Sequence, residues 1–103
     1  MIHVIAIITA KTRHRQAVLD AFLANTAAVH TEKGCIEYGA AIDAEGVGSF
    51  QTPFGPDTFL AIEKWAGVEE LKAHAVAPHM MAYSAKAKDL IASRVIHVLS
   101  PVS

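Results

Sequence analysis

The sequence has very little cysteine: Cys35 is the only one among 103 residues, so no internal disulfide can form. A lone thiol is typical of a reducing compartment, and we therefore expect a cytoplasmic protein. Nine lysines and arginines stand against ten acidic residues, without a basic run, so nucleic acid is not an expected partner. No apolar run approaches the roughly 18 residues of a membrane-spanning helix, so no membrane contact is expected.

Signatures of several common kinds of catalytic site are missing as well. The six histidines form no His-x-x-x-His or Glu-x-x-His pair, so no bound metal is expected. The sequence contains no glycine-rich phosphate loop and no dinucleotide fingerprint. It also lacks the Gly-x-Ser-x-Gly motif of serine hydrolases. We therefore expect neither a metal nor a nucleotide cofactor.

Apolar residues are abundant and make up 52% of the chain, a high share for so short a sequence. A chain of this length fits one domain, and we expect a single domain over residues 1–103. The interior of such a small domain is limited, so the excess apolar surface has to be buried elsewhere. A subunit interface is the simplest place, which predicts a homo-oligomer.

The hydrophobic pattern predicts four strands and three helices. Strands are expected at residues 2–9, 35–43, 58–65 and 95–99, and helices at residues 13–33, at 68–75 and from Pro78 onward. Thr12 is the expected N-cap of the first helix, and Gly34 is expected to end it. Residues 44–57 contain three glycines and two prolines and predict a long loop, with an apolar underside from Phe50 and Phe54.

This order of elements is that of a split βαβ, ferredoxin-like α+β fold. It predicts a four-stranded antiparallel sheet with helices on one face only. In the second strand, Ile36, Tyr38, Ala40 and Ile42 are expected to share a face. The first strand is apolar at odd and even positions alike, so both of its faces need cover. We therefore expect a homodimer that packs sheet against sheet through the open face.

Residues 62–83 contain most of the side chains capable of chemistry. Glu63 lies on an otherwise apolar face of the strand expected at residues 58–65, where burial would raise the pKa of its carboxyl group. His74 and His79 follow in two helical segments, and histidine changes its charge close to neutral pH. Structural alternatives exist, because a histidine at a helix end can satisfy the last carbonyls, and Trp65 can be a core residue.

Five segments of the chain, at residues 15–22, 32–38, 48–51, 62–65 and 71–84, resemble the antibiotic-biosynthesis monooxygenase family. The most specific part is a Glu-x-Trp strand end followed by Leu-x-Ala-His and Pro-His-Met. Within this family the chain is most similar to the bacterial quinol monooxygenases. The resemblance implies a ferredoxin-like dimeric α/β barrel. It also implies oxidation of a small hydroquinone by O2 without flavin, haem or metal.

Other branches of the family match less well at the positions that matter. The polyketide-anthrone oxygenases have an asparagine where this chain has Ala61 and an arginine where it has Ala85, so a polyketide substrate is not expected. Haem-degrading relatives have an asparagine in the first strand, and none occurs here. The residues that match the quinol branch are Glu63, Trp65, His74, His79 and Tyr83.

The resemblance and the residue types together define an expected site. His74 is the first choice for the base that removes a proton from the hydroquinone. His79 is the alternative base or a second proton carrier, and Glu63 would relay a proton or orient a histidine. Trp65 and Phe59 are expected to contact the aromatic ring. The expected hydrogen-bond partners of its oxygens are Asn25, Tyr38 and Tyr83.

Two other functions stay open at this point. The first is an isomerase or lyase of the same fold that acts on a small sugar-derived signal, with basic groups from Lys33, Lys86 and Arg94. The second is a non-enzymatic dimer that sequesters quinones. A pure binder does not need titratable groups, so His74 and His79 distinguish it from an enzyme.

Overall fold

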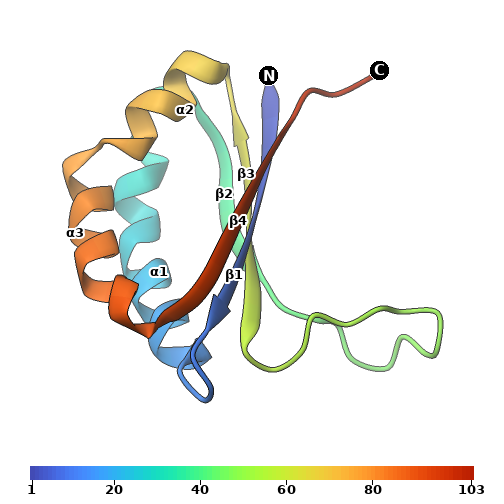
Figure 1. Cartoon of the computed structure of the whole chain (residues 1–103). Helices are drawn as coiled ribbons and strands as arrows, with labels where there is room; N and C mark the ends of the chain where they lie inside the picture. Colours follow the sequence, from blue (N-terminus) through green and yellow to red (C-terminus); the bar gives the residue numbers. More distant parts are fainter.

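A four-stranded antiparallel sheet carries all helices on one of its faces (Figure 1). The computed structural model describes residues 1–103. The strands are β1 (Ile2–Ala10), β2 (Cys35–Ala41), β3 (Thr58–Trp65) and β4 (Ile91–Leu99), in the sheet order β2-β3-β1-β4. The helical elements are α1 (Arg15–His30), α2 (Val68–Ala75), α3 (Pro78–Ala87) and the short 3-10 turn η1 (Lys88–Leu90). The predicted ferredoxin-like α+β fold is confirmed.

The core lies between the sheet and the helices. Along β1 the even-numbered side chains are buried and the odd-numbered ones are only partly covered, as the two-residue period of a strand requires. Val18, Phe22 and Val29 of α1 are buried against the sheet. Trp65 and Phe59 of β3 are fully buried as well. The helical stripe of apolar residues in α1 therefore packs as its spacing predicts.

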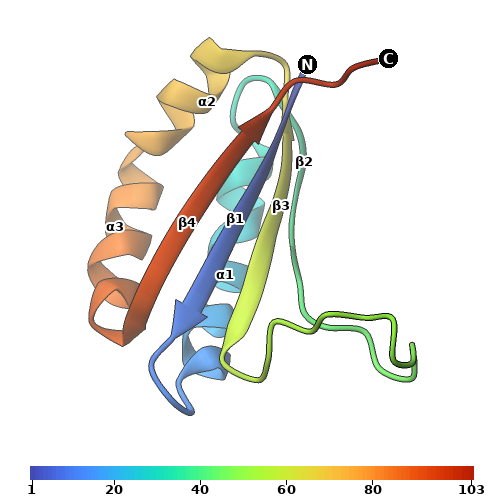
Figure 2. The same ribbon diagram turned by 45° about the vertical axis from the view of Figure 1, so that its right-hand side comes forward.

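The opposite face of the sheet has no helix over it (Figure 2). Its side chains are apolar at the centre, where Ile5 pairs with Ile62 and Ile7 lies between Leu60 and Val95. This is the face through which we expect the homodimer. The structure contains one chain, so the dimer stays a prediction. Sedimentation of the protein at twice the chain mass of 11.0 kDa would support it.

The first helix begins later than expected. Arg13 takes a positive φ of 69°, and its N–H donates a hydrogen bond to Asp57 Oδ1. This left-handed residue interrupts the helical backbone, so α1 starts at Arg15. The prediction of Thr12 as N-cap is therefore wrong: His14 occupies that position and makes no side-chain capping bond.

The same helix ends earlier than expected, at His30 instead of Lys33. Gly34 then takes a φ of 81°, and a Cβ at this position would collide with the side chain of Glu70. Glycine is therefore favoured at position 34 both by the left-handed backbone and by the closeness of the Glu70 side chain. The tight turn places Glu32 between the end of α1 and the start of β2, close to the helices that cover the sheet.

The second strand contains a bulge that its sequence pattern did not reveal. The pairing with β3 slips by one residue between Cys35 and Glu37, so Ile36 is left without a partner. The prediction that Ile36 shares a face with Tyr38 is wrong, because Ile36 is 56% exposed and Tyr38 is buried. The strand also ends at Ala41, before the expected end.

The last strand is longer than expected. It begins at Ile91, not at Val95, because it pairs with β1 as far back as Ala10. The extension places Arg94 opposite Ile8, whose side chain is buried under the helices. Arg94 is therefore on the helix-facing side of the sheet.

Residues 42–57 form a long loop that projects away from the sheet (Figures 1 and 2). The carboxylate of Asp43 accepts hydrogen bonds from the N–H groups of Phe54 and Gly55 and so closes the base of the loop. The expected apolar underside does not form. Phe50 is 85% exposed and Phe54 is 51% exposed, because the loop extends beyond the core.

Candidate active site

A cavity of about 210 Å³ lies between the helices and the sheet. Most of its wall is apolar, with side chains from β1, α1, α2, α3 and β4. Its polar members come from five different elements: Tyr38, Glu63, His74, Tyr83, Ser84 and Arg94. A mostly apolar cavity with a few convergent polar groups is the usual form of a small-molecule site.

The predicted site residues divide into those that line this cavity and those that do not. The residues in its wall are Tyr38, Glu63, His74 and Tyr83. Trp65 and Phe59 are fully buried in the core. Asn25 and His79 border a separate hollow of about 150 Å³ between α1 and α3. The structure therefore brings together four of the eight side chains around one space.

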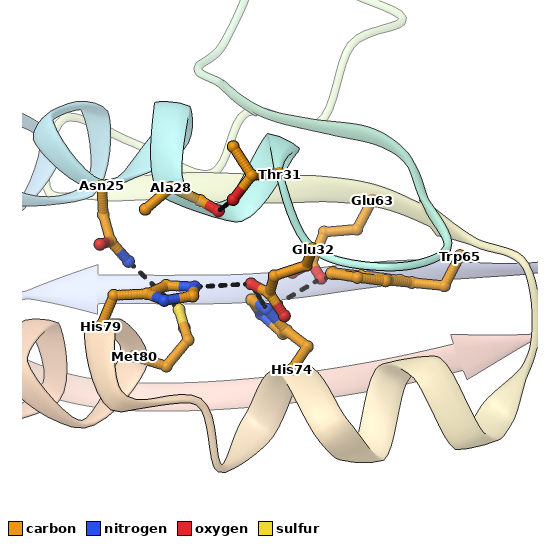
Figure 3. Close-up of polar contacts among 9 residues, drawn as sticks. All are labelled: Asn25, Ala28, Thr31, Glu32, Glu63, Trp65, His74, His79 and Met80. Atoms are coloured by element: carbon orange, nitrogen blue, oxygen red, sulfur yellow. Dashed lines mark hydrogen bonds and ion pairs between the residues drawn. The ribbon is translucent and has the colours of Figure 1, made fainter.

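One carboxylate that we did not predict connects two of the predicted residues. Glu32 Oε2 accepts hydrogen bonds from Nδ1 of His74 over 2.8 Å and from Nε2 of His79 over 2.7 Å (Figure 3). An ionised carboxylate can only accept, so both imidazole nitrogens carry protons in this arrangement. No sequence pattern identified Glu32, because it lies in the turn after α1 and its partners are 42 and 47 positions away.

The hydrogen bond to Glu32 determines which ring nitrogen of His74 carries the proton. With Nδ1–H donated to Glu32, Nε2 is the nitrogen that is free to accept a proton in the neutral ring. Nε2 lies 3.9 Å from Glu63 Oε1, which is too far for a direct hydrogen bond. The ring packs against Trp65 at a centroid distance of 4.5 Å and against the edge of Tyr38 at 5.5 Å. His74 is therefore a buried and well-oriented proton acceptor.

Glu63 is the second acidic group near His74. Its Oε1 accepts a hydrogen bond of 2.9 Å from Nε1–H of Trp65 (Figure 3). Burial raises the pKa of the Glu63 carboxyl, and the Trp65 bond and the nearby His74 only partly oppose this. Trp65 therefore holds a catalytic candidate in place instead of forming part of the cavity wall.

Two tyrosines supply hydroxyl groups to the cavity. Tyr38 stacks on Phe22 at 5.0 Å, and Tyr83 meets the same ring edge-on at 6.2 Å. Burial raises the pKa of both phenols, so both remain protonated donors at neutral pH. The Tyr83 hydroxyl is buried without a hydrogen-bond partner. A buried hydroxyl without a hydrogen-bond partner is rare in folded proteins. It suits a ligand that would accept a hydrogen bond from it.

Two kinds of feature are absent from the structure. No three histidine, cysteine, aspartate or glutamate side chains converge as they would to hold a metal ion. None of the helices has the length and apolar character needed to cross a membrane.

Comparison with known families identifies the class of protein that this fold and cavity belong to. Residues 1–86 match the family model described as antibiotic biosynthesis monooxygenase. Over 88 residues the chain is 40% identical to the probable quinol monooxygenase YgiN of Escherichia coli K12. That match covers 85% of this chain and 84% of the relative. The chain belongs to the antibiotic biosynthesis monooxygenase family, and the resemblance stated from the sequence is confirmed.

Solved structures share the fold over nearly the whole chain. A Nitrosomonas europaea protein named for the same family superposes with a TM-score of 0.84 at 18% identity, with 100% of both chains covered. PA3566 from Pseudomonas aeruginosa gives a TM-score of 0.81 at 24% identity, covering 99% of this chain and 94% of the other. At these identities the likeness concerns the fold alone.

Glu63→Gln is expected to gain stability relative to the wild type as the pH rises. The folded protein holds the Glu63 proton more tightly than the unfolded chain, because the folded pKa lies above the ordinary value of 4.5. The contribution of this group to the free energy of unfolding is therefore complete below that value and is lost as the pH rises through the folded pKa. Glutamine has no charge to bury, so its contribution to the free energy of unfolding does not change with pH.

Urea denaturation at acidic and at neutral pH measures this difference. Glu69→Gln is the control, because the side chain of Glu69 is 86% exposed and its removal should change little at either pH. A difference between Glu63→Gln and the wild type that does not change with pH would contradict the assigned burial cost.

Proposed function

We propose that this protein oxidises a small hydroquinone-type aromatic with O2, without bound flavin, haem or metal. The observation that carries the proposal is His74, which is buried in the wall of an apolar cavity and held by the carboxylate of Glu32. Membership of a monooxygenase family supports the use of O2. The 40% identical relative named as a probable quinol monooxygenase supports a hydroquinone as substrate.

A hydroquinone supplies the electrons for this reaction itself. Loss of a phenolic proton converts it to an anion that gives up an electron to O2 readily. In one outcome the hydroquinone and O2 form a quinone and hydrogen peroxide. In a monooxygenation they form a hydroxyquinone and water, so that one oxygen atom enters the ring. In both outcomes the protein has to accept a proton, hold the ring and keep water away from reactive intermediates.

The Glu32–His74 pair is suited to the proton step. Nε2 of His74 accepts the phenolic proton, and the carboxylate of Glu32 stabilises the imidazolium that forms, as in other carboxylate–histidine pairs. His79 lies on the far side of Glu32, and its side chain is 28% exposed against 6% for His74. The imidazolium at His74 is therefore stabilised by a carboxylate whose second partner, His79, reaches solvent.

The size and lining of the cavity suit a small aromatic ring. An apolar cavity of about 150 Å³ accepts a benzene molecule, and the space here is about 210 Å³. The aromatic side chains of Phe22 and Tyr38 and the thioether of Met80 are in its wall. Of the three basic groups expected for the sugar-derived substrate, only Arg94 lines the cavity, and the mostly apolar wall suits an aromatic ring better than a sugar.

Oxygen uptake with a panel of reduced hydroquinones tests the proposal, under conditions that suppress autoxidation and with mass analysis of the product. We expect uptake above background that scales with protein concentration, with a quinone or hydroxyquinone as product. Binding of the hydroquinones without oxygen uptake would contradict the proposed reaction and favour the quinone-binding alternative.

A further inference from the structure

One part of the cavity wall has no role in the proton step described above. Tyr83 and Ser84 of α3 and Arg94 of β4 line the main cavity. The same three residues also line an adjoining hollow of about 180 Å³, where they are joined by Lys88 and Ile91. We call Tyr83, Ser84, Lys88 and Arg94 the basic end of the cavity.

The charges at the basic end are not neutralised within the chain. The ion pairs of the structure involve Lys64, Lys72 and two histidines, and neither Arg94 nor Lys88 takes part in one. The Tyr83 hydroxyl is buried and unpaired beside them. The arginine, the lysine and the unpaired phenol at this end of the cavity are all hydrogen-bond donors. The ligand group that fits there is therefore a negatively charged acceptor.

The basic end is separated from the acidic groups by the register of the sheet. Glu63 pairs with Val4 of β1, and Arg94 pairs with Ile8 of the same strand. Four residues along a strand correspond to about 13 Å, and the two side chains also come from strands on opposite sides of β1. The side chains of Glu63 and Arg94 nevertheless line one cavity, so a bound ring has the acidic group toward one end and the basic end toward the other.

We propose that the basic end binds a carboxylate carried by the substrate, so that the preferred substrates are hydroquinones with an acidic substituent. The inference rests on the proposed function, because it names the substrate class of the same cavity. Arg94 binds the carboxylate as a two-pronged donor, and the Tyr83 hydroxyl donates to it from the buried side. The anchored acid directs a ring hydroxyl toward Nε2 of His74.

Equilibrium binding under nitrogen tests this assignment with two matched probes, a dihydroxybenzoate with its hydroxyls para to each other and the uncharged amide of the same compound. We expect the wild type to bind the acid about tenfold more tightly than the amide, the size of one charge-assisted contact. Arg94→Gln should remove this preference, because it lowers the affinity for the acid much more than the affinity for the amide. Arg94→Lys should retain part of it, because the charge remains.

The control is Lys72→Gln, which removes one positive charge from a side chain that is 70% exposed and outside the cavity wall. It should keep the preference of the wild type. Equal affinity of the wild type for acid and amide, or an unchanged preference in Arg94→Gln, would overturn the inference. The binding assay contains no O2, so its result does not depend on the oxidation. Selective binding here, combined with no oxygen uptake in the separate turnover assay, would reject the proposed oxidation alone. Oxygen uptake without selective binding would reject the acid site alone.

Discussion

His74→Ala is expected to lower the kcat for hydroquinone oxidation by about a hundredfold or more, the usual contribution of a positioned general base. In the wild type, Glu32 accepts the Nδ1 hydrogen of an imidazole that lines the cavity, which leaves Nε2 free to take up a proton. The only other carboxylate close to this point is Glu63, whose Oε1 already accepts a hydrogen bond from the indole N–H of Trp65, so Glu63 replaces the imidazole poorly. Steady-state oxygen uptake measures the loss.

His79→Ala is the matched comparison for this variant. It removes the other partner of the same Glu32 oxygen and leaves the bond between Glu32 and His74 in place. We expect a smaller decrease in kcat from it, because the proton acceptor itself is retained. Binding of a hydroquinone under nitrogen should be similar in both variants and shows that the cavity is intact. Wild-type turnover in His74→Ala would refute the assignment of the base.

Glu32→Gln is expected to lower the kcat by about a hundredfold, although Glu32 does not reach the cavity. The amide oxygen of glutamine can still accept a hydrogen bond, but it carries no charge to stabilise the imidazolium that forms when His74 takes a proton. The amide can also donate to a ring nitrogen, which would leave the wrong nitrogen of His74 protonated. The rate of oxygen uptake at saturating substrate is the measurement.

The KM should change much less than the kcat in Glu32→Gln, because Glu32 is not in the cavity wall. Glu69→Gln removes a negative charge from an exposed position of α2 and should have no effect on either constant. If Glu32→Gln retained the wild-type kcat, the histidine would not depend on its carboxylate, and the proposed role of Glu32 in the proton step would have to be abandoned.

The arrangement of the elements could be predicted from the sequence because it depends on local patterns. The two-residue period of a strand places Glu63 on the same face of β3 as Phe59, Ala61 and Trp65, so Glu63 could be expected in the interior. The helical segments around Pro78 then bring His74 and Tyr83 over the same face of the sheet. Such regularities depend only on residues that are close in sequence.

The parts that could not be predicted depend on contacts between distant residues or on irregular backbone. Glu32 meets His74 across 42 positions of the sequence, from the turn that follows the end of α1 at His30. The bulge at Ile36 and the left-handed Arg13 are likewise single-residue departures from a regular pattern. None of these features leaves a periodic signal that a sequence reading could detect.

The aromatic residues show the same limit in another way. Trp65 and Phe59 were expected to contact the substrate ring because aromatic side chains suit such a surface. In the structure both are fully buried. Trp65 instead donates a hydrogen bond to Glu63 and packs against His74, so it supports both groups from behind. The residue type predicted proximity to the site, but only the fold could distinguish the wall from its support.

Oxygen uptake before and after exhaustive chelation is the most direct test of the central claim, that hydroquinone and O2 react here without a metal or an organic cofactor. Both rates should be measured on one protein sample, with its metal content and its visible absorbance recorded alongside. We expect the same rate in both states, with no flavin or haem absorbance and a metal content well below one equivalent per chain. Loss of the rate on chelation, followed by recovery when one metal is restored, would contradict it.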